Sequence, residues 1–226
     1  MAPTKVRTIA YVDGYNFYHG RLKHTRFKWL DLPALLASIL CVQDPTSELV
    51  CVKLFTAHIK ARFARRAQLS TMAQNTYHRA LVSRGVHIVY GRFVLSQEWA
   101  PRCREGMALD RDERVKVWLL GEKQTDVQLA LHLYRDARTS DCEQIMLCTN
   151  DSDLAPALEL VRSDCPGVRV GVVLPRPPEL QARKSKTLQD LAHWTREHIL
   201  DEELSAHQLP SRVQTGRKPA DRPEHW

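Results

Sequence analysis

One apolar run that ends in two aspartates constrains the fold of this chain more than any other stretch. Residues 145–148 (Ile-Met-Leu-Cys) are followed by Thr and Asn and then by Asp151 and Asp153, and residues 154–161 continue with apolar side chains at helical spacing. A short apolar run bounded by turn-forming residues is typical of a central parallel strand. Open α/β sheets bind ligands at the carboxyl ends of their strands, so we expect both aspartates to lie at a functional edge.

A second strand with an acid at its end begins the chain. Residues 7–12 (Arg-Thr-Ile-Ala-Tyr-Val) precede Asp13, and a helical segment follows from Asn16. Because parallel strands end at the same edge of a sheet, we expect Asp13 to lie near Asp151 if the two strands are neighbours. Apolar runs predict three more strands, at residues 49–55, 86–90 and 168–174.

The alternation of these strands with helical segments predicts an α/β fold. We expect a three-layer α/β/α sandwich around a mainly parallel five-stranded sheet, formed as a single domain by residues 1–200. Residues 91–121 interrupt the alternation, and both a hairpin that faces a substrate and a merely solvated loop would account for them. The Pro-, Arg- and Gln-bearing residues 201–226 are expected to form a disordered tail.

The chain is basic, which favours polyanionic partners. It has 33 Lys and Arg against 26 Asp and Glu, a net charge of +7 and a pI near 9.2. Residues 201–226 hold four basic and five acidic residues, so the basic excess belongs to residues 1–200. The six cysteines form no C-x-x-C pair, and the sequence has neither an apolar signal core nor a run of membrane-spanning length. We therefore expect a soluble cytoplasmic protein with free thiols and no membrane partner.

Four aspartates are candidate metal ligands. Asp13, Asp151 and Asp153 follow two predicted strands, and Asp126 lies in the first turn of a predicted helix. Carboxylates packed closely together repel one another, and they stay ionised only beside a compensating cation. Hard oxygen ligands of this kind suit Mg²⁺ or Mn²⁺, which would polarise a phosphodiester and activate a water. Helix capping by Asp126 and Asp153 is the competing, purely structural interpretation.

Three stretches together resemble a known family. Asp13-Gly-Tyr-Asn16, Lys123-Gln-Thr-Asp126 and Thr149-Asn-Asp151-Ser-Asp153-Leu are similar, in this order, to the signature stretches of the NYN domain, in the LabA-like branch of the PIN-like nuclease superfamily. The resemblance covers about residues 6–175 and implies metal-dependent cleavage of RNA. Members of the family commonly carry Gly where this chain has Asn150, and Asn tolerates a left-handed backbone better than most residues.

The resemblance also implies roles for individual residues. Asp13, Asp126, Asp151 and Asp153 match the acidic metal cluster of the family, and Asn16 matches the polar residue that follows the first acid. Related nucleases are commonly dimers, so the resemblance makes a homodimer a further expectation.

Basic residues beyond the second predicted strand are candidates for binding RNA. Residues 57–84 contain no acid, and the group just past that strand consists of Lys60, Arg62, Arg65 and Arg66. We expect this group to contact the phosphates of single-stranded RNA, with a solvated helix face as the alternative. Lys123 is either a further phosphate contact or a solvated lysine. The larger aromatic side chains are expected in the core rather than as platforms for stacked bases, namely Trp29, Trp99, Trp118 and Trp194.

These observations favour a metal-dependent ribonuclease that hydrolyses RNA phosphodiester bonds with a metal-activated water. An RNA-binding or protein-interaction module that has kept the fold without the chemistry is the alternative. A HAD-type phosphatase is disfavoured, because it needs a second acid two residues after the first, where this chain has Tyr15. Neither the P-loop pattern nor the dinucleotide-binding fingerprint occurs in the sequence.

Overall fold

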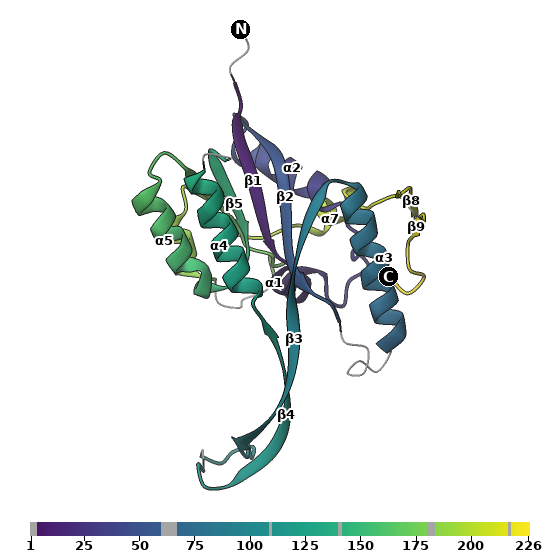
Figure 1. Cartoon of the computed structure of the whole chain (residues 1–226), viewed down its shortest axis with the longest axis vertical. Coiled ribbons are helices and arrows are strands. Elements are labelled where there is room, and N and C mark those ends of the chain that lie inside the picture. Colours follow the sequence, from purple (N-terminus) through teal and green to yellow (C-terminus); the bar gives the residue numbers. More distant parts are fainter. Residues whose placement is uncertain (1–3, 60–66, 109, 140–141, 180–183, 217) are drawn as a thin grey trace.

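A seven-stranded, mostly parallel sheet forms the centre of the protein (Figure 1). The structure is a computed structural model that describes residues 4–59, 67–108, 110–139, 142–179, 184–216 and 218–226. The sheet has the order β4-β3-β2-β1-β5-β6-β7 and consists of β1 (Val6–Asp13), β2 (Ser47–Ala57), β3 (Val86–Pro101), β4 (Arg114–Lys123), β5 (Gln144–Cys148), β6 (Arg169–Val173) and β7 (Trp194–Arg196). Neighbouring strands pair in parallel except for the antiparallel pair β3 and β4.

The prediction of five strands was wrong, because the sheet has one further strand at each edge. At one edge β4 is the second arm of the excursion that interrupts the βα alternation, and it extends the sheet beyond β3. At the other edge β7 has only three residues, all half-buried, and pairs with β6. A strand so short, inside a segment of amphipathic pattern, leaves no clear period in the sequence.

Helices cover both faces of this curled sheet, which confirms the α/β prediction. One face packs against α2 (Leu32–Gln43), α3 (Ala67–Ser83) and α7 (Asp201–Ala206). The other face packs against α4 (Thr125–Arg138), α5 (Ala155–Asp164) and α6 (Lys186–Leu191). Short helical turns at the carboxyl edge are α1 (Gly14–Phe17), the π-helix η1 (Tyr18–Leu22) and the 3₁₀-helix η3 (Ser152–Leu154).

The two central strands are apolar along their length because both of their faces are buried. In β1, Ala10 and Val12 point into the core shared with α2, whereas Ile9 and Tyr11 point into the core shared with α4 and α5. All five residues of β5 are buried. Such continuous apolar runs are characteristic of parallel sheets that are covered on both sides.

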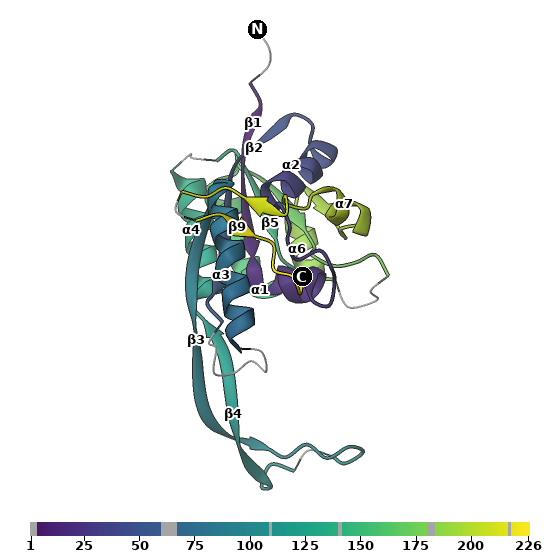
Figure 2. The ribbon, with the colours of Figure 1, turned by 90° about the vertical axis from the view of Figure 1, so that its right-hand side faces the viewer.

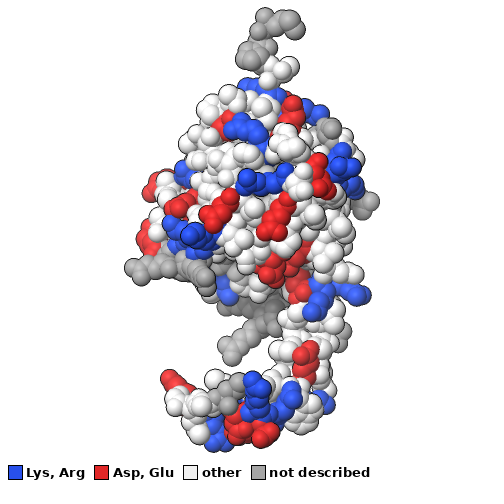
Figure 3. Space-filling view, turned by 90° about the vertical axis from the view of Figure 1, so that its left-hand side faces the viewer, with Lys and Arg blue, Asp and Glu red and all other residues white. Residues whose placement is uncertain are grey.

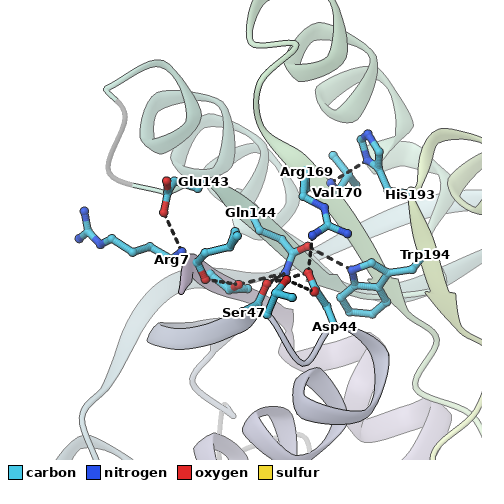
Figure 4. A network of polar contacts seen from close by, with 12 residues as sticks. Arg7, Asp44, Ser47, Glu143, Gln144, Arg169, Val170, His193 and Trp194 are labelled. Carbon is cyan, nitrogen blue, oxygen red and sulfur yellow. Dashed lines mark hydrogen bonds and ion pairs between the residues drawn. The ribbon is translucent and has the colours of Figure 1, made fainter. Parts of the chain in front are cut away.

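A polar network closes the opposite, amino-terminal edge of the sheet (Figure 4). The buried Gln144 donates to the Ser47 hydroxyl at 3.0 Å and accepts a hydrogen bond from the Trp194 indole at 3.2 Å. Asp44 accepts from Ser47 at 2.6 Å and forms an ion pair with Arg169 at 2.7 Å. These contacts join β2, β5, β6 and β7 and satisfy the buried polar groups, so we assign this edge a structural role.

Residues 201–226 do not form the disordered tail that their composition suggested. Beyond α7, β8 (Arg212–Val213) and β9 (Ala220–Asp221) pair as a small antiparallel ladder. The fully buried Trp29 anchors this segment, since its indole N–H donates to the Pro210 carbonyl at 2.7 Å and its ring packs with Val213 and Trp226. The anchor lies far away in the sequence, so the polar composition of the segment gave no sign of it.

The excursion at residues 91–121 is a long hairpin that extends away from the body of the protein (Figure 2). Of the hairpin and the loop that the sequence allowed, the structure has the hairpin. Its arms pair without interruption from Arg92–Lys123 to Pro101–Arg114. Within the part of the chain that the structure describes, no helix has the length and apolar character needed to cross a membrane.

Candidate functional site

The acidic ends of β1 and β5 lie side by side, as the sequence predicts. The two strands pair in parallel from Thr8–Gln144 to Val12–Cys148. From β1 the chain runs outward through β2 and β3, and from β5 it runs outward in the opposite direction through β6 and β7. The boundary between β1 and β5 is therefore the topological switch point, where open α/β sheets form a ligand-binding crevice.

Asp13 ends β1 and begins the first helical turn. Its carboxylate accepts hydrogen bonds from the Asn16 backbone N–H at 3.0 Å and from the Thr149 hydroxyl at 2.9 Å. The residue is only 4% exposed. Gly14 follows it because a Cβ there would approach the Phe55 carbonyl oxygen to 2.7 Å, so only glycine fits between the ends of β1 and β2.

The segment that follows β5 is tied to the first helical turn by side-chain hydrogen bonds. The Asn16 side-chain oxygen accepts from the Asn150 N–H at 2.9 Å, and the Thr149 hydroxyl accepts from the Asp151 N–H at 3.1 Å. The Asn150 side-chain oxygen accepts in turn from the Ser185 N–H at 2.9 Å. Asn16 therefore acts as a positioning residue between the two acidic strand ends, and Asn150 uses its side chain where a glycine would have none.

Two carboxylates reach the same edge from the end of the hairpin and the start of α4. Asp126 lies in the first turn of α4, after Gln124, whose φ of 76° turns the chain sharply out of β4. A left-handed non-glycine residue is uncommon, and such backbone positions cluster at functional sites. Glu122 accepts a hydrogen bond from the Thr125 hydroxyl at 2.5 Å.

The acids line one cavity of about 390 Å³. Asp13, Asp126 and Asp151 line it, as predicted, and so does Asn16. Glu122, which was not among the predicted site residues, also lines it. Its position four residues before Asp126, directly after the excursion at residues 91–121, was the available signal. Figure 3 shows acidic side chains gathered at the edge of the body where the hairpin leaves it.

The structure does not place Asp153 among the residues that line this cavity. It lies exposed in the first turn of η3, and its backbone N–H donates to the Asp151 carboxylate at 3.0 Å. Its charge still reaches the cavity, because it contributes to the raised pKa of Asp126.

Burial and mutual repulsion favour the neutral forms of these carboxyl groups. Burial raises the pKa of Asp13 to about 6, and Asp126 and Asp151 add to the increase against the opposing hydrogen bonds from Asn16 and Thr149. Burial also raises the pKa of Asp126, with Asp151 and Asp153 as further causes, and it raises the pKa of Glu122. A cation in the cavity would offset this repulsion.

The donor set fits a hard divalent cation that retains water ligands. Among the described residues, no group of three or more His, Cys, Asp or Glu side chains lies close enough together to hold a metal ion by itself. Mg²⁺ is usually held by one or two carboxylates together with waters and substrate phosphates, so an open cavity lined by Asp13, Asp126 and Asp151 suits it. A closed all-protein cage would suit Zn²⁺ better.

The predicted RNA-binding residues Lys60, Arg62, Arg65 and Arg66 lie outside the residues that the structure describes. Lys123 is exposed at the end of β4, opposite Arg92. At the far end of the hairpin, Lys and Arg side chains gather together with acids (Figure 3).

One face of the hairpin leads directly into the acidic cavity. Residues directly opposite in an antiparallel pair share a face, and successive residues alternate. The shared face therefore carries Phe93 and Glu122, then Leu95 and Leu120, then Gln97 and Trp118, then Trp99 and Lys116. Phe93, Leu120 and Glu122 line the cavity. Trp99 and Trp118 are 60% and 64% exposed, so the expectation that they lie in the core was wrong, whereas Trp29 is buried as expected.

A second cavity of about 310 Å³ adjoins the first. Tyr15, Phe93 and Glu122 line both cavities and so form the wall between them. The second cavity has mostly aromatic and aliphatic walls, and Trp226, from the C-terminal segment, is one of its lining residues. No local sequence pattern predicts this cavity, because its walls come from segments that only the fold brings together.

Comparison with known proteins adds to this description. A model of the family described as NYN domain matches residues 7–193. The 6-hydroxy-3-succinoylpyridine 3-monooxygenase HspA of Pseudomonas putida is 38% identical over 250 residues, an alignment that covers 98% of this chain and 75% of the relative. A crystal structure of a Vibrio parahaemolyticus protein of unknown function is 18% identical and has a TM-score of 0.54, covering 89% of this chain and 98% of that one, so it shares the fold.

Proposed function

This chain belongs to the NYN domain family, and from that premise we propose that it is a metal-dependent ribonuclease of the LabA-like, PIN-like kind. One observation carries the proposal. Carboxylates from three separate parts of the chain line a single cavity at the edge where the strand order reverses. Charged groups are costly to bury together, so a fold that assembles them at a ligand-binding crevice has a function for them.

Asp13, Asp126 and Asp151 would hold a Mg²⁺ or Mn²⁺ ion, directly or through water. When bound, such a cation neutralises charge on a phosphodiester and lowers the pKa of a water. The chain itself fixes the Asp13 carboxylate through Asn16 and Thr149, so the direction of its free lone pairs is set before substrate binds. The raised pKa of Glu122 makes its carboxylate a better proton acceptor than an exposed one, and we assign it the proton of the attacking water.

The substrate would be single-stranded RNA that reaches the cavity along the hairpin face. Trp118 and Trp99 offer exposed rings on which bases can stack, and Lys116 and Arg114 stand beside them for phosphate contacts. Stacking of this kind tolerates any base, because every base has a π face. The face and the cavity are continuous through Leu120 and Phe93, so a bound strand would lead its backbone to the acids.

The test is cleavage of a labelled single-stranded RNA by purified protein with Mn²⁺ or Mg²⁺. We expect the variant Asp13→Asn with Asp151→Asn to abolish cleavage without lowering the melting temperature, because both positions lose only charge. Asp190→Asn is the matched control, since Asp190 is an exposed acid on α6 outside the cavity, and it should cleave like wild type. Cleavage that survives the double change would refute the assignment, and RNA binding without any cleavage would favour the silent RNA-binding module.

A second candidate function is oxygenation of a heteroaromatic acid. The monooxygenase relative is 38% identical over 98% of this chain, and the aromatic-lined cavity beside the acids has room for a single substituted ring. A monooxygenation transfers one atom of O₂ to the substrate and reduces the other atom to water with two protons and with two electrons from a reduced donor.

Oxygen uptake distinguishes this second function from the first. The assay supplies 6-hydroxy-3-succinoylpyridine, a reduced nicotinamide as electron donor, and each divalent metal in turn. Substrate-dependent oxygen uptake at a rate that Asp190→Asn retains would favour the oxygenase, whereas uptake that is equal with and without the pyridine would count against it.

A further inference from the structure

We propose that the aromatic cavity beside the acids binds a planar heteroaromatic ring that carries an anionic substituent, namely the nucleobase next to the scissile phosphate. The proposal rests on the ribonuclease function for the identity of the ligand, but the chemistry of the cavity also accommodates a free heteroaromatic acid. Two features of the cavity carry the inference: the nature of its walls, and a lysine that makes no ion pair within the described part of the chain.

The walls of the cavity are suited to a flat ring. Tyr15 and Phe93 line both this cavity and the acidic one, and Tyr18, Tyr77 and Trp226 are further aromatic lining residues. Tyr15 is 51% exposed and its ring lies 4.2 Å from the His19 ring, so the pair presents a ready aromatic surface. Rings stacked against such surfaces gain both apolar burial and aromatic contact.

Three of the described lining residues are histidines, and one of them, His78, is uncharged at neutral pH. His78 is buried and bonds to the Tyr90 hydroxyl at 3.0 Å, and its burial lowers its pKa to about 4. The Gln74 side chain is occupied by the backbone of Ile59 and Ala57. The part of the cavity beside His78 and Gln74 therefore favours a neutral ring over a charged group.

Among the described residues that line the cavity, Lys28 is the one lysine, and no arginine joins it. Lys28 makes no ion pair with any acid in the part of the chain that the structure describes. An ammonium group beside apolar walls attracts an anionic substituent on the bound ring. A nucleotide meets both requirements, because its base is planar and its phosphate is negative.

The two cavities adjoin, so one nucleotide can place its base in the aromatic cavity and its phosphodiester at the acidic one. Because Tyr15, Phe93 and Glu122 line both cavities, a base held in the aromatic cavity places its own backbone at the wall of the acidic one. The volume, about 310 Å³, lies near the lower end of the range of small-molecule pockets, about 300–1,000 Å³. It therefore suits one base rather than a stack of several.

The experiment measures binding in EDTA, so that it does not depend on catalysis. The probes are the four nucleoside 5′-monophosphates, ribose 5-phosphate and 6-hydroxynicotinic acid. Ribose 5-phosphate has the phosphate without the ring, and 6-hydroxynicotinic acid is a free heteroaromatic acid. Titration calorimetry measures the affinity of each. We expect a monophosphate to bind and ribose 5-phosphate to bind at least about tenfold more weakly, because it cannot stack. Equal binding of the two phosphates would overturn the proposal.

Two neighbouring positions on α3 provide a matched pair of variants. Ser70 lines the cavity and Leu69, which is 52% exposed, does not, so Ser70→Phe fills the cavity while Leu69→Phe adds the same bulk outside it. We expect Ser70→Phe to weaken monophosphate binding at least about tenfold and Leu69→Phe to leave it unchanged. Tyr18→Ala tests the same cavity in a second way, because it removes an aromatic ring from the wall instead of filling the cavity; Tyr18 is 39% exposed. Ser70→Phe and Tyr18→Ala variants that both fold and bind like wild type would contradict the proposal.

The variant Lys28→Gln tests whether the cavity attracts the anionic substituent of the ligand. Lys23→Gln, at an exposed position outside the cavity, is its control. Loss of affinity for phosphate-bearing rings in the first variant alone supports the assignment, and equal effects of the two variants oppose it. Binding of the pyridine acid but of none of the nucleotides, with the same sensitivity to Ser70→Phe, would overturn the assignment to a nucleobase. The cleavage assay decides on the ribonuclease, so the two proposals can fail separately.

Discussion

Replacement of Asp13 by Asn should stabilise the metal-free protein at neutral and alkaline pH. Asp13 is 4% exposed, and burial, with help from Asp126 and Asp151, raises its pKa from 3.8 to about 6. Because the folded-state pKa lies above the unfolded one, the protein is most stable while this group is protonated in both states, below pH 3.8. That stability is lost as the pH rises through about 6, where the buried group ionises.

The pKa difference sets the size of the effect. A shift of about two units corresponds to about 3 kcal/mol at pH 8, an upper limit on what ionisation of Asp13 costs the folded state. Asn keeps one acceptor for the Asn16 N–H but weakens the hydrogen bond with Thr149, which costs about 1 kcal/mol. The variant should therefore unfold with a free energy about 1–2 kcal/mol higher than wild type at pH 8, and with no advantage at pH 4.

Urea denaturation in EDTA at pH 4, 6 and 8 measures this difference, with Asp190→Asn as the control for loss of a surface charge. A second series with Mg²⁺ or Mn²⁺ should raise the stability of wild type at pH 8 more than that of Asp13→Asn, because the variant lacks one of the three carboxylates that would hold the cation. A variant that is less stable than wild type at pH 8, or a difference that does not change between pH 4 and pH 8, would refute the electrostatic account.

Three further predictions concern the hairpin, the core and the C-terminal segment. Trp118→Ala should weaken binding of single-stranded RNA about tenfold in a fluorescence-anisotropy titration while circular dichroism melting stays unchanged, since the ring is 64% exposed. Asp136→Ala should lower the free energy of unfolding by about 3–5 kcal/mol in urea, because it leaves the largely buried Lys53 ammonium without its partner. Deletion of residues 209–226 should lower it by at least about 2 kcal/mol through exposure of Trp29, whereas a disordered tail could be removed at no cost.

The central part of the fold could be predicted because it depends on local patterns. Five apolar runs with helical segments between them specify parallel strands, and an acid directly after such a run must lie at the carboxyl edge. Adjacency of β1 and β5 then follows from the commonest strand order of doubly wound sheets, and the structure has it. Asp13 and Asp151 were selected on this basis, and Asp126 from its place in the first turn of a predicted helix.

The parts that could not be predicted depend on contacts between distant segments. Glu122 faces the acids only because the hairpin returns along β3 and ends beside α4. The C-terminal segment is ordered by Trp29, which lies near the other end of the chain. Trp99 and Trp118 read as core residues by type, but they lie on a two-stranded arm that has no second layer to cover them.

The arrangement of the two cavities also bears on why one fold would serve both RNA cleavage and, in a relative, the oxygenation of a pyridine. Each chemistry needs a flat heteroaromatic ring held beside a polar reaction centre, and in this chain Tyr15 and Phe93 separate a ring-sized cavity from a carboxylate-lined one. The ring cavity alone does not decide between them. The acidic cavity distinguishes the two chemistries. The charge-neutral Asp13→Asn variant should lose hydrolysis of a phosphodiester but keep the affinity of the aromatic cavity for a ring. If Asp13→Asn instead abolished binding of 6-hydroxynicotinic acid in EDTA, the two cavities would act as one site and this separation of roles would be wrong.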